Sequence, residues 1–90
     1  MANYQLIKAL NEYLGDYNVL NSWFNSDKTH ANTTLEIIVG KLRALRRKLK
    51  GLKKQITKDV KEKYDNLTNS VKTLIEKIEA ELYTTISASV

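Results

Sequence analysis

Apolar residues recur at alternating spacings of three and four along most of this chain of 90 residues, and no proline interrupts them. A spacing of three and four places side chains on one face of an α-helix, so the pattern restricts the chain to helical structure. The length is that of one domain covering residues 1–90. We therefore predict a single, all-α domain.

Three segments carry this helical pattern. They cover roughly residues 3–25, 33–65 and 70–84. The polar residues 26–32 separate the first two segments and predict a loop. Gly15 is the weak point of the first helix, because an interior glycine costs about 1 kcal/mol relative to alanine. The tail, residues 85–90, is small and β-branched, and we expect it to fray.

The second segment begins with a helix-start signal and continues as a coiled-coil pattern. Thr33 and Glu36 have the spacing of a capping box, in which each side chain bonds the backbone N–H of the other residue. A strict heptad spacing then follows at Leu35, Ile38, Leu42, Leu45, Leu49, Leu52 and Ile56. After Ile56 the apolar positions shift by extra fours, to Val60, Tyr64 and Leu67.

Residues 65–70 decide between two architectures. Five of these six residues have low helix propensity, because their side chains compete with the backbone for hydrogen bonds. A break there predicts an antiparallel three-helix bundle. Without a break, residues 33–84 would form one long coiled-coil-like helix in a helical hairpin. The polar run favours the bundle.

The charge is concentrated in the middle of the chain. The net charge is +5, but residues 41–63 hold eleven basic residues against two acidic ones, a local balance of +9. The flanking residues 1–40 and 64–90 each carry −2. This distribution has an intramolecular explanation and a functional one.

In the intramolecular explanation, the acidic arms neutralise the basic helix. Folding back through the first loop would bring Asp16 of the first helix near Arg43 of the basic helix, and Glu12 near Arg46 or Arg47. Folding back through residues 65–70 would bring two carboxylates of the third helix near lysines. The expected pairs there are Glu79 with Lys58 and Glu81 with Lys54. Each exposed pair would contribute at most about 1 kcal/mol.

In the functional explanation, basic side chains that point to solvent bind nucleic-acid phosphates. The heptad pattern places these side chains away from the apolar stripe. They are Arg43, Arg47, Lys50 and Lys54, with Lys58 and Lys61 extending the row. No aromatic residue lies in residues 41–63, so base stacking is not expected. Phosphate contacts alone predict binding without sequence preference.

A second hypothesis is that the chain is a structural or interaction subunit, a homo-oligomer or a partner of another helical protein. Its interface would use the coiled-coil stripe and part of the third helix. The candidate interface residues are Leu42, Leu45, Leu49, Leu52, Ile56, Leu74 and Ile78. Trp23 lies one position off the core stripe and is a candidate contact anchor, although core packing is the simpler expectation. Membrane-surface binding by the same amphipathic segment ranks third.

The sequence holds few of the residues that catalysis and metal binding use most often. There is no cysteine, and the single histidine, His30, lies in a polar loop where we expect it to be exposed. We therefore predict no metal site, no cofactor and no enzymatic activity. The absence of a signal peptide or a membrane span leads us to expect a cytoplasmic protein.

Overall fold

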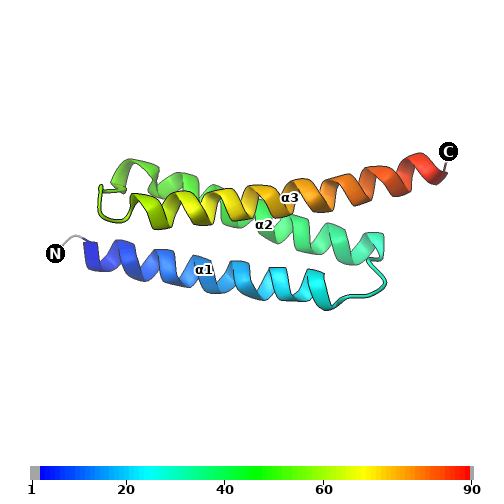
Figure 1. The fold of residues 1–90 in the computed structure, drawn as a ribbon, viewed down its shortest axis with the longest axis horizontal. Helices are drawn as coiled ribbons and strands as arrows, with labels where there is room; N and C mark the ends of the chain where they lie inside the picture. Colours follow the sequence, from blue (N-terminus) through cyan, green and yellow to red (C-terminus); the bar gives the residue numbers. More distant parts are fainter. Residues whose placement is uncertain (1–2, 90) are drawn as a thin grey trace.

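The computed structural model describes the backbone of residues 3–89 and the side chains of residues 4–82. It contains helices α1 (Asn3–Ser26), α2 (Asn32–Leu52) and α3 (Lys61–Ser89), with a short 3₁₀ helix, η1 (Lys53–Gln55), after α2. Helices α1 and α3 run in the same direction and α2 runs in the opposite one (Figure 1). The chain forms an elongated bundle of 54 × 21 × 17 Å. The predicted all-α helical bundle is confirmed.

The core is made of the apolar side chains that the 3–4 spacing places on the inner face of each helix. No polar or charged side chain is buried within residues 4–82. The buried residues are Leu6, Leu10, Leu20, Phe24, Leu35, Ile38, Val39, Leu42, Leu45, Leu49, Val60, Tyr64, Leu67, Val71, Leu74, Ile75 and Ile78. Tyr13, Tyr17, Leu52, Ile56 and Leu82 pack against them while partly exposed.

The break between the second and third helices lies earlier than predicted. The expected break at residues 65–70 is wrong, because these residues belong to the interior of α3. The chain instead leaves the helix after Gln55, and Val60 N–H donates to the carbonyl of Thr57 in the turn that leads into α3. The single long helix over residues 33–84 is excluded as well. Helix α3 also continues to Ser89, past the predicted end at residue 84, and fraying of residues 85–90 stays a prediction.

Packing explains why the polar run stays helical. The buried residues Val60, Tyr64, Leu67 and Val71 continue at a 3–4 spacing through it, so the apolar stripe of α3 passes under the polar side chains. The hydroxyl of Thr68 donates to the carbonyl of Asp65, three residues earlier in the same helix. This side chain is therefore hydrogen-bonded without leaving the helix. Burial of this stripe outweighs the low helix propensity of its neighbours.

Helix α1 is one uninterrupted helix through Gly15, in agreement with the single helix predicted over roughly residues 3–25. One local expectation is corrected. Helix α2 begins without the predicted capping box, since its N-cap residue is Ala31 and no side chain bonds the cap. The backbone N–H of Leu35 donates to the carbonyl of Ala31 at 2.9 Å, which starts the helix with main-chain bonds alone.

Tyr64 ties the start of α3 to the end of α2. Its hydroxyl donates a hydrogen bond of 2.8 Å to the carbonyl of Leu49, inside the core. Leu49 lies in the last turn of α2, where carbonyls lack a partner within the helix. The backbone N–H of Lys53 donates to the carbonyl of Lys50 and not to that of Leu49. The Tyr64 hydroxyl therefore gives the buried carbonyl of Leu49 the hydrogen bond that Lys53 does not supply.

Within residues 3–89, no helix combines the length and the apolar character that crossing a lipid bilayer requires.

Candidate functional site

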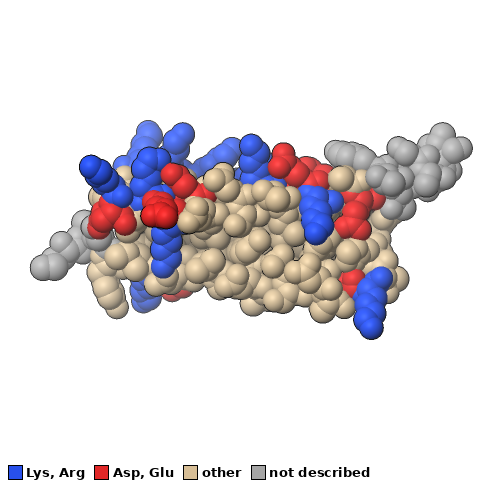
Figure 2. Space-filling view, in the orientation of Figure 1, with Lys and Arg blue, Asp and Glu red and all other residues tan. Residues whose placement is uncertain are grey.

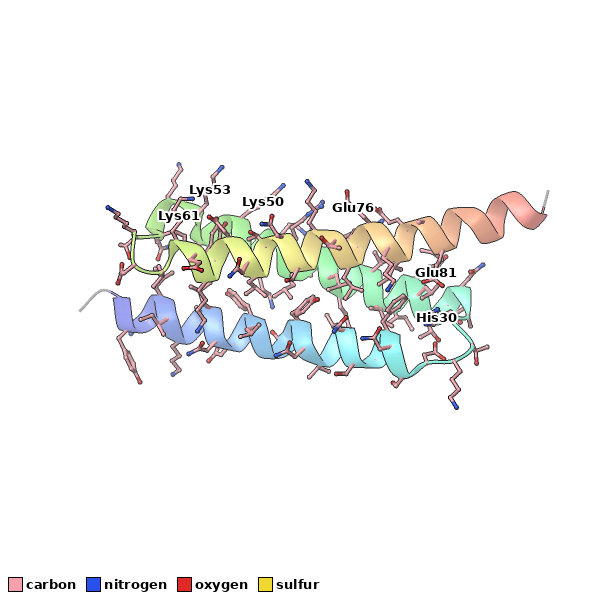
Figure 3. All side chains as sticks on the ribbon, viewed as in Figure 1. His30, Lys50, Lys53, Lys61, Glu76 and Glu81 are labelled. Atoms are coloured by element: carbon pink, nitrogen blue, oxygen red, sulfur yellow. The ribbon has the colours of Figure 1, made fainter. Side chains whose placement is uncertain are left out.

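The basic residues gather at the end of the bundle where α2 meets α3. Lysine and arginine side chains gather at this end with some carboxylates among them, whereas the surface over α1 is largely uncharged in the same view (Figure 2). Lys50, Lys53 and Lys61 lie on this end, on the side of the bundle away from α1 (Figure 3). The early turn at residues 56–60 brings the last basic residues of α2 next to those at the start of α3.

Two of the six predicted phosphate-binding residues are held by carboxylates of the same chain. Arg43 donates to Glu79 at 2.6 Å, and Lys61 to Asp65 at 2.9 Å, one turn along α3. Both pairs are exposed, with 46% of the Arg43 side chain and 66% of the Lys61 side chain accessible. Exposed pairs of this kind contribute little to stability.

The four carboxylate pairings that the sequence suggested are not the ones that form among the described side chains. Glu79 pairs with Arg43 and not with Lys58, and Glu81 bonds His30 and not Lys54. The reason is the position of the turn. With the break at residues 56–60, the last turns of the described part of α3 lie beside the first half of α2.

The other four predicted contacts, Arg47, Lys50, Lys54 and Lys58, are exposed. Lys53 of η1 is exposed beside them, and none of the five forms an ion pair within residues 4–82. We call these five residues the basic surface. Lys50, Lys53 and Lys54 lie at the C-terminal end of α2, where the helix dipole favours positive charge. Their concentration there is therefore compatible with a stable helix end.

The predicted interface residues lie inside a single chain. Leu42, Leu49 and Ile78 have no exposed surface, and Leu45 and Leu74 are at most 5% exposed. Leu52 and Ile56 pack against the same core from its edge. Among these residues Trp23 has the largest exposed fraction, 38%, and it lies outside the buried core, so the simpler expectation of core packing is wrong and the contact anchor stays a prediction. The coiled-coil stripe is therefore occupied by α1 and α3 of its own chain.

His30 does more than the sequence suggested. Its ring stacks on Phe24, with 4.5 Å between the ring centroids, so the prediction of an exposed loop histidine is wrong. Its Nδ1 lies 2.8 Å from Oε1 of Glu81, and its Nε2 lies 2.8 Å from the carbonyl oxygen of Phe24. Both partners are acceptors, so both ring nitrogens donate when the two bonds are complete, and the imidazole is then a cation.

The electrostatic surroundings agree with a charged ring. The hydrogen bond to Glu81 raises the pKa of His30 above 6.5, the bond to Phe24 adds to this, and partial burial opposes it. The carboxylate of Asp27 acts in the same direction as Glu81, more weakly. No local pattern could have revealed this pair, because 51 residues separate His30 from Glu81.

The remaining chemistry of the described residues is limited. Burial, together with the nearby charge of Asp65, raises the pKa of the Tyr64 hydroxyl above 10.0. Among residues 4–82, no group of three histidine, aspartate or glutamate side chains is placed to hold a metal ion. The basic surface is thus the main concentration of like charge that the structure brings together.

Comparison with known proteins adds no family or relative to this description. No protein-family model matches the chain, and neither the characterised proteins nor the solved structures include one that is similar to it.

Proposed function

We propose that the basic surface binds the phosphate groups of nucleic acids without preference for base sequence, and that the protein is not an enzyme. The observation that supports this most is the clustering of five exposed cations without an ion-paired carboxylate, Arg47, Lys50, Lys53, Lys54 and Lys58, at one end of the bundle. Cations in this arrangement attract a polyanion and release its bound counterions, which drives binding.

The shape of the basic surface suits a phosphate backbone. From Arg47 to Lys54 the helical rise is about 10 Å, and Lys58 follows in the turn after η1. Arg47, Lys50 and Lys54 are three and four residues apart and share one side of the helix, so a phosphate strand that follows the helix would contact all three. Arg43 and Lys61 precede and follow this row in the sequence. Each would add a phosphate contact by giving up its ion pair, with Glu79 and Asp65 respectively.

The lack of aromatic side chains favours phosphate contacts over base contacts. Tyr64 is the nearest aromatic residue that follows the basic segment, and it is buried and bonded to Leu49. The ring of Tyr64 is therefore not available for stacking on unpaired bases. The expected partner is a double- or single-stranded nucleic acid of any sequence, in the cytoplasmic location expected from the sequence.

The test is fluorescence anisotropy with a short DNA duplex of arbitrary sequence, titrated between about 50 and 200 mM salt. Four or five phosphate contacts predict a log–log slope of about −4, unchanged on a scrambled duplex. Replacing Arg47, Lys50, Lys54 and Lys58 with glutamine should abolish binding. No binding of the unchanged protein at about 50 mM salt and micromolar concentration would refute the proposal.

A matched control variant distinguishes the effect of where the positive charges lie from the effect of the net charge of the protein. Lys8, Lys28, Lys72 and Lys77 are exposed, lie off the basic surface and carry the same total charge. Replacing these four with glutamine should leave most of the affinity and the slope intact. Equal loss in both variants would mean that only the net charge matters, and the basic surface would then have no special role.

The two rival hypotheses require the bundle to open. Self-assembly through the coiled-coil stripe, or insertion of that stripe into a membrane surface, would expose Leu42, Leu45 and Leu49, which are buried in the core. Binding to anionic lipid vesicles without loss of the bundle would have to use the basic surface alone. Vesicle flotation of the same two glutamine variants distinguishes that outcome from nucleic-acid binding.

A further inference from the structure

A groove with an apolar floor runs between α1 and α2, away from the basic surface. Its floor contains Leu20 and Leu45, which are buried, and its sides contain Val19 and Trp23. Val19 is 66% exposed and Trp23 is 38% exposed. Exposed apolar side chains of this size, next to an apolar floor, are typical of a contact surface.

The two edges of this groove carry opposite charges. On the α1 edge lies Asp16, with Glu12 one helical turn earlier on the same side. On the α2 edge lie Lys41 and Lys48. All four side chains are exposed, and none forms an ion pair within the described part of the chain. Lys48 lies over the ring of Tyr13, 6.0 Å from its centroid.

We propose that a second copy of this chain covers the groove, forming a symmetric dimer whose twofold axis runs along the groove. In that arrangement α1 of each copy lies over α2 of the other. Each acidic edge then faces a basic edge. Glu12 and Asp16 of one copy lie opposite the partner's Lys41 and the partner's Lys48, and the twofold symmetry repeats this contact on the other side of the interface. A twofold axis across the groove would place like charges together, which opposes association.

The size of the face agrees with a dimer. Helix α1 has 24 residues and is therefore about 36 Å long. The bundle is 21 Å across, so this face is close to the area of about 800 Å² per partner that stable complexes bury. Trp23 and Val19 would supply apolar contacts at the interface, where tryptophan is a frequent anchor.

The dimer does not rest on the proposed nucleic-acid binding, because it uses different residues. Arg47, Lys50 and Lys54 stay outside the groove. Two basic surfaces in one dimer would strengthen binding to a long nucleic acid by effective concentration.

The experiment is sedimentation equilibrium of the unchanged chain and of charge-reversed variants. The unchanged chain should dimerise, and a monomer at every concentration up to about 1 mM would overturn the proposal. The variant E12K/D16K has two basic edges, and K41E/K48E has two acidic ones. Each alone should have its dimer dissociation constant raised at least about a hundredfold by like charges.

Combining the two charge-reversed variants gives a sharper test of the orientation. An equimolar mixture of E12K/D16K and K41E/K48E should form a heterodimer, and the variant with all four changes should dimerise with itself again. Failure of both would overturn the proposed orientation. Circular dichroism of each variant must show the helical content of the unchanged chain, so that loss of the dimer is not loss of the fold.

Matched controls reverse the same number of charges elsewhere. Glu36, Glu76, Lys28 and Lys72 are exposed and do not line the groove. The variants E36K/E76K and K28E/K72E should keep the dimer. If either control dissociates the dimer as strongly as its counterpart, the contact lies somewhere other than this groove.

Discussion

The imidazole of His30 and the carboxylate of Glu81 are 2.8 Å apart and connect the loop between α1 and α2 to α3. His30 has a backbone φ of +48°, in the left-handed region that few residues other than glycine adopt. The conformation turns its ring toward the bundle, where the ring also stacks on Phe24 and bonds its carbonyl. The ammonium of Lys77 lies 5.4 Å from the centroid of the same Phe24 ring. The loop is thus held by the His30 ring, whose two nitrogens each lie within hydrogen-bond distance of an acceptor.

The first prediction is that the free energy of unfolding depends on the charge of His30. The folded-state pKa of His30 lies above 6.5, chiefly because of the hydrogen bond to Glu81. The pair therefore contributes fully below the unfolded-state pKa of 6.5, and its contribution is lost as the pH rises through the folded-state pKa. Urea unfolding between about pH 5.5 and 8.5 should show stability decreasing with rising pH in this range.

The variant H30N is the control for this pH dependence. Asparagine tolerates the left-handed backbone conformation but has no titratable ring, so the loop keeps its geometry and loses the cation. The decrease in stability with rising pH should be much smaller in H30N. An unchanged pH profile in H30N would show that another group causes the dependence.

The second prediction concerns the hydroxyl of Tyr64. In Y64F the buried carbonyl of Leu49 would lose its hydrogen-bond donor, which should reduce the free energy of unfolding by about 1–2 kcal/mol. Urea denaturation measures this as a lower midpoint. Tyr4, with 72% of its surface exposed, provides a matched control, and Y4F should leave the midpoint unchanged. Equal midpoints for Y64F and the unchanged chain would contradict the role assigned to this bond.

Most of the fold could be predicted from the sequence, because apolar spacing determines which face of a helix is buried. The stripe from Leu6 to Phe24 predicts α1, and the heptads through Leu49 predict the buried face of α2. The position of the turn is harder to predict, because a change of spacing such as the one after Ile56 also occurs within continuous helices. That change marks the end of α2 and η1, since Ile56 has an extended backbone. The polar residues 65–70 predict a break by their low helix propensity, but the buried stripe beneath them keeps them helical.

The candidate site was only partly predictable for a related reason. The exposure of Arg47, Lys50 and Lys54 follows from their positions on one helix, which the heptad pattern describes. The ion pair of Arg43 with Glu79, and that of His30 with Glu81, depend on how far α3 extends along the bundle. A shift of the turn by about ten residues changes every such pairing between helices, because each residue rises about 1.5 Å along its helix.

The third prediction distinguishes core packing from an oligomer interface at Ile78. Ile78 has no exposed surface, so I78A would leave a cavity and cost about 2–5 kcal/mol. That is a large part of the stability of a domain of this size. The variant should unfold at much lower urea concentration at every protein concentration. The control is I37A, since Ile37 is 50% exposed, and it should change little. Destabilisation of I78A that disappears at high protein concentration would indicate an interface instead.

The last prediction is that alanine at Gly15 stabilises the protein. Gly15 lies inside α1 with a negative φ, and a Cβ added there would have no neighbouring atom within 4 Å. Alanine therefore fits without strain, and it restricts the unfolded chain more than glycine does. G15A should raise the free energy of unfolding by about 0.5–1 kcal/mol, measured as a higher urea midpoint with an unchanged slope. Gly40 in α2 has the same open surroundings, so G40A should give a similar gain, and the two gains should add in the double variant. A lower midpoint for G15A would mean that the backbone at this position, or a contact made by the partner copy, requires glycine.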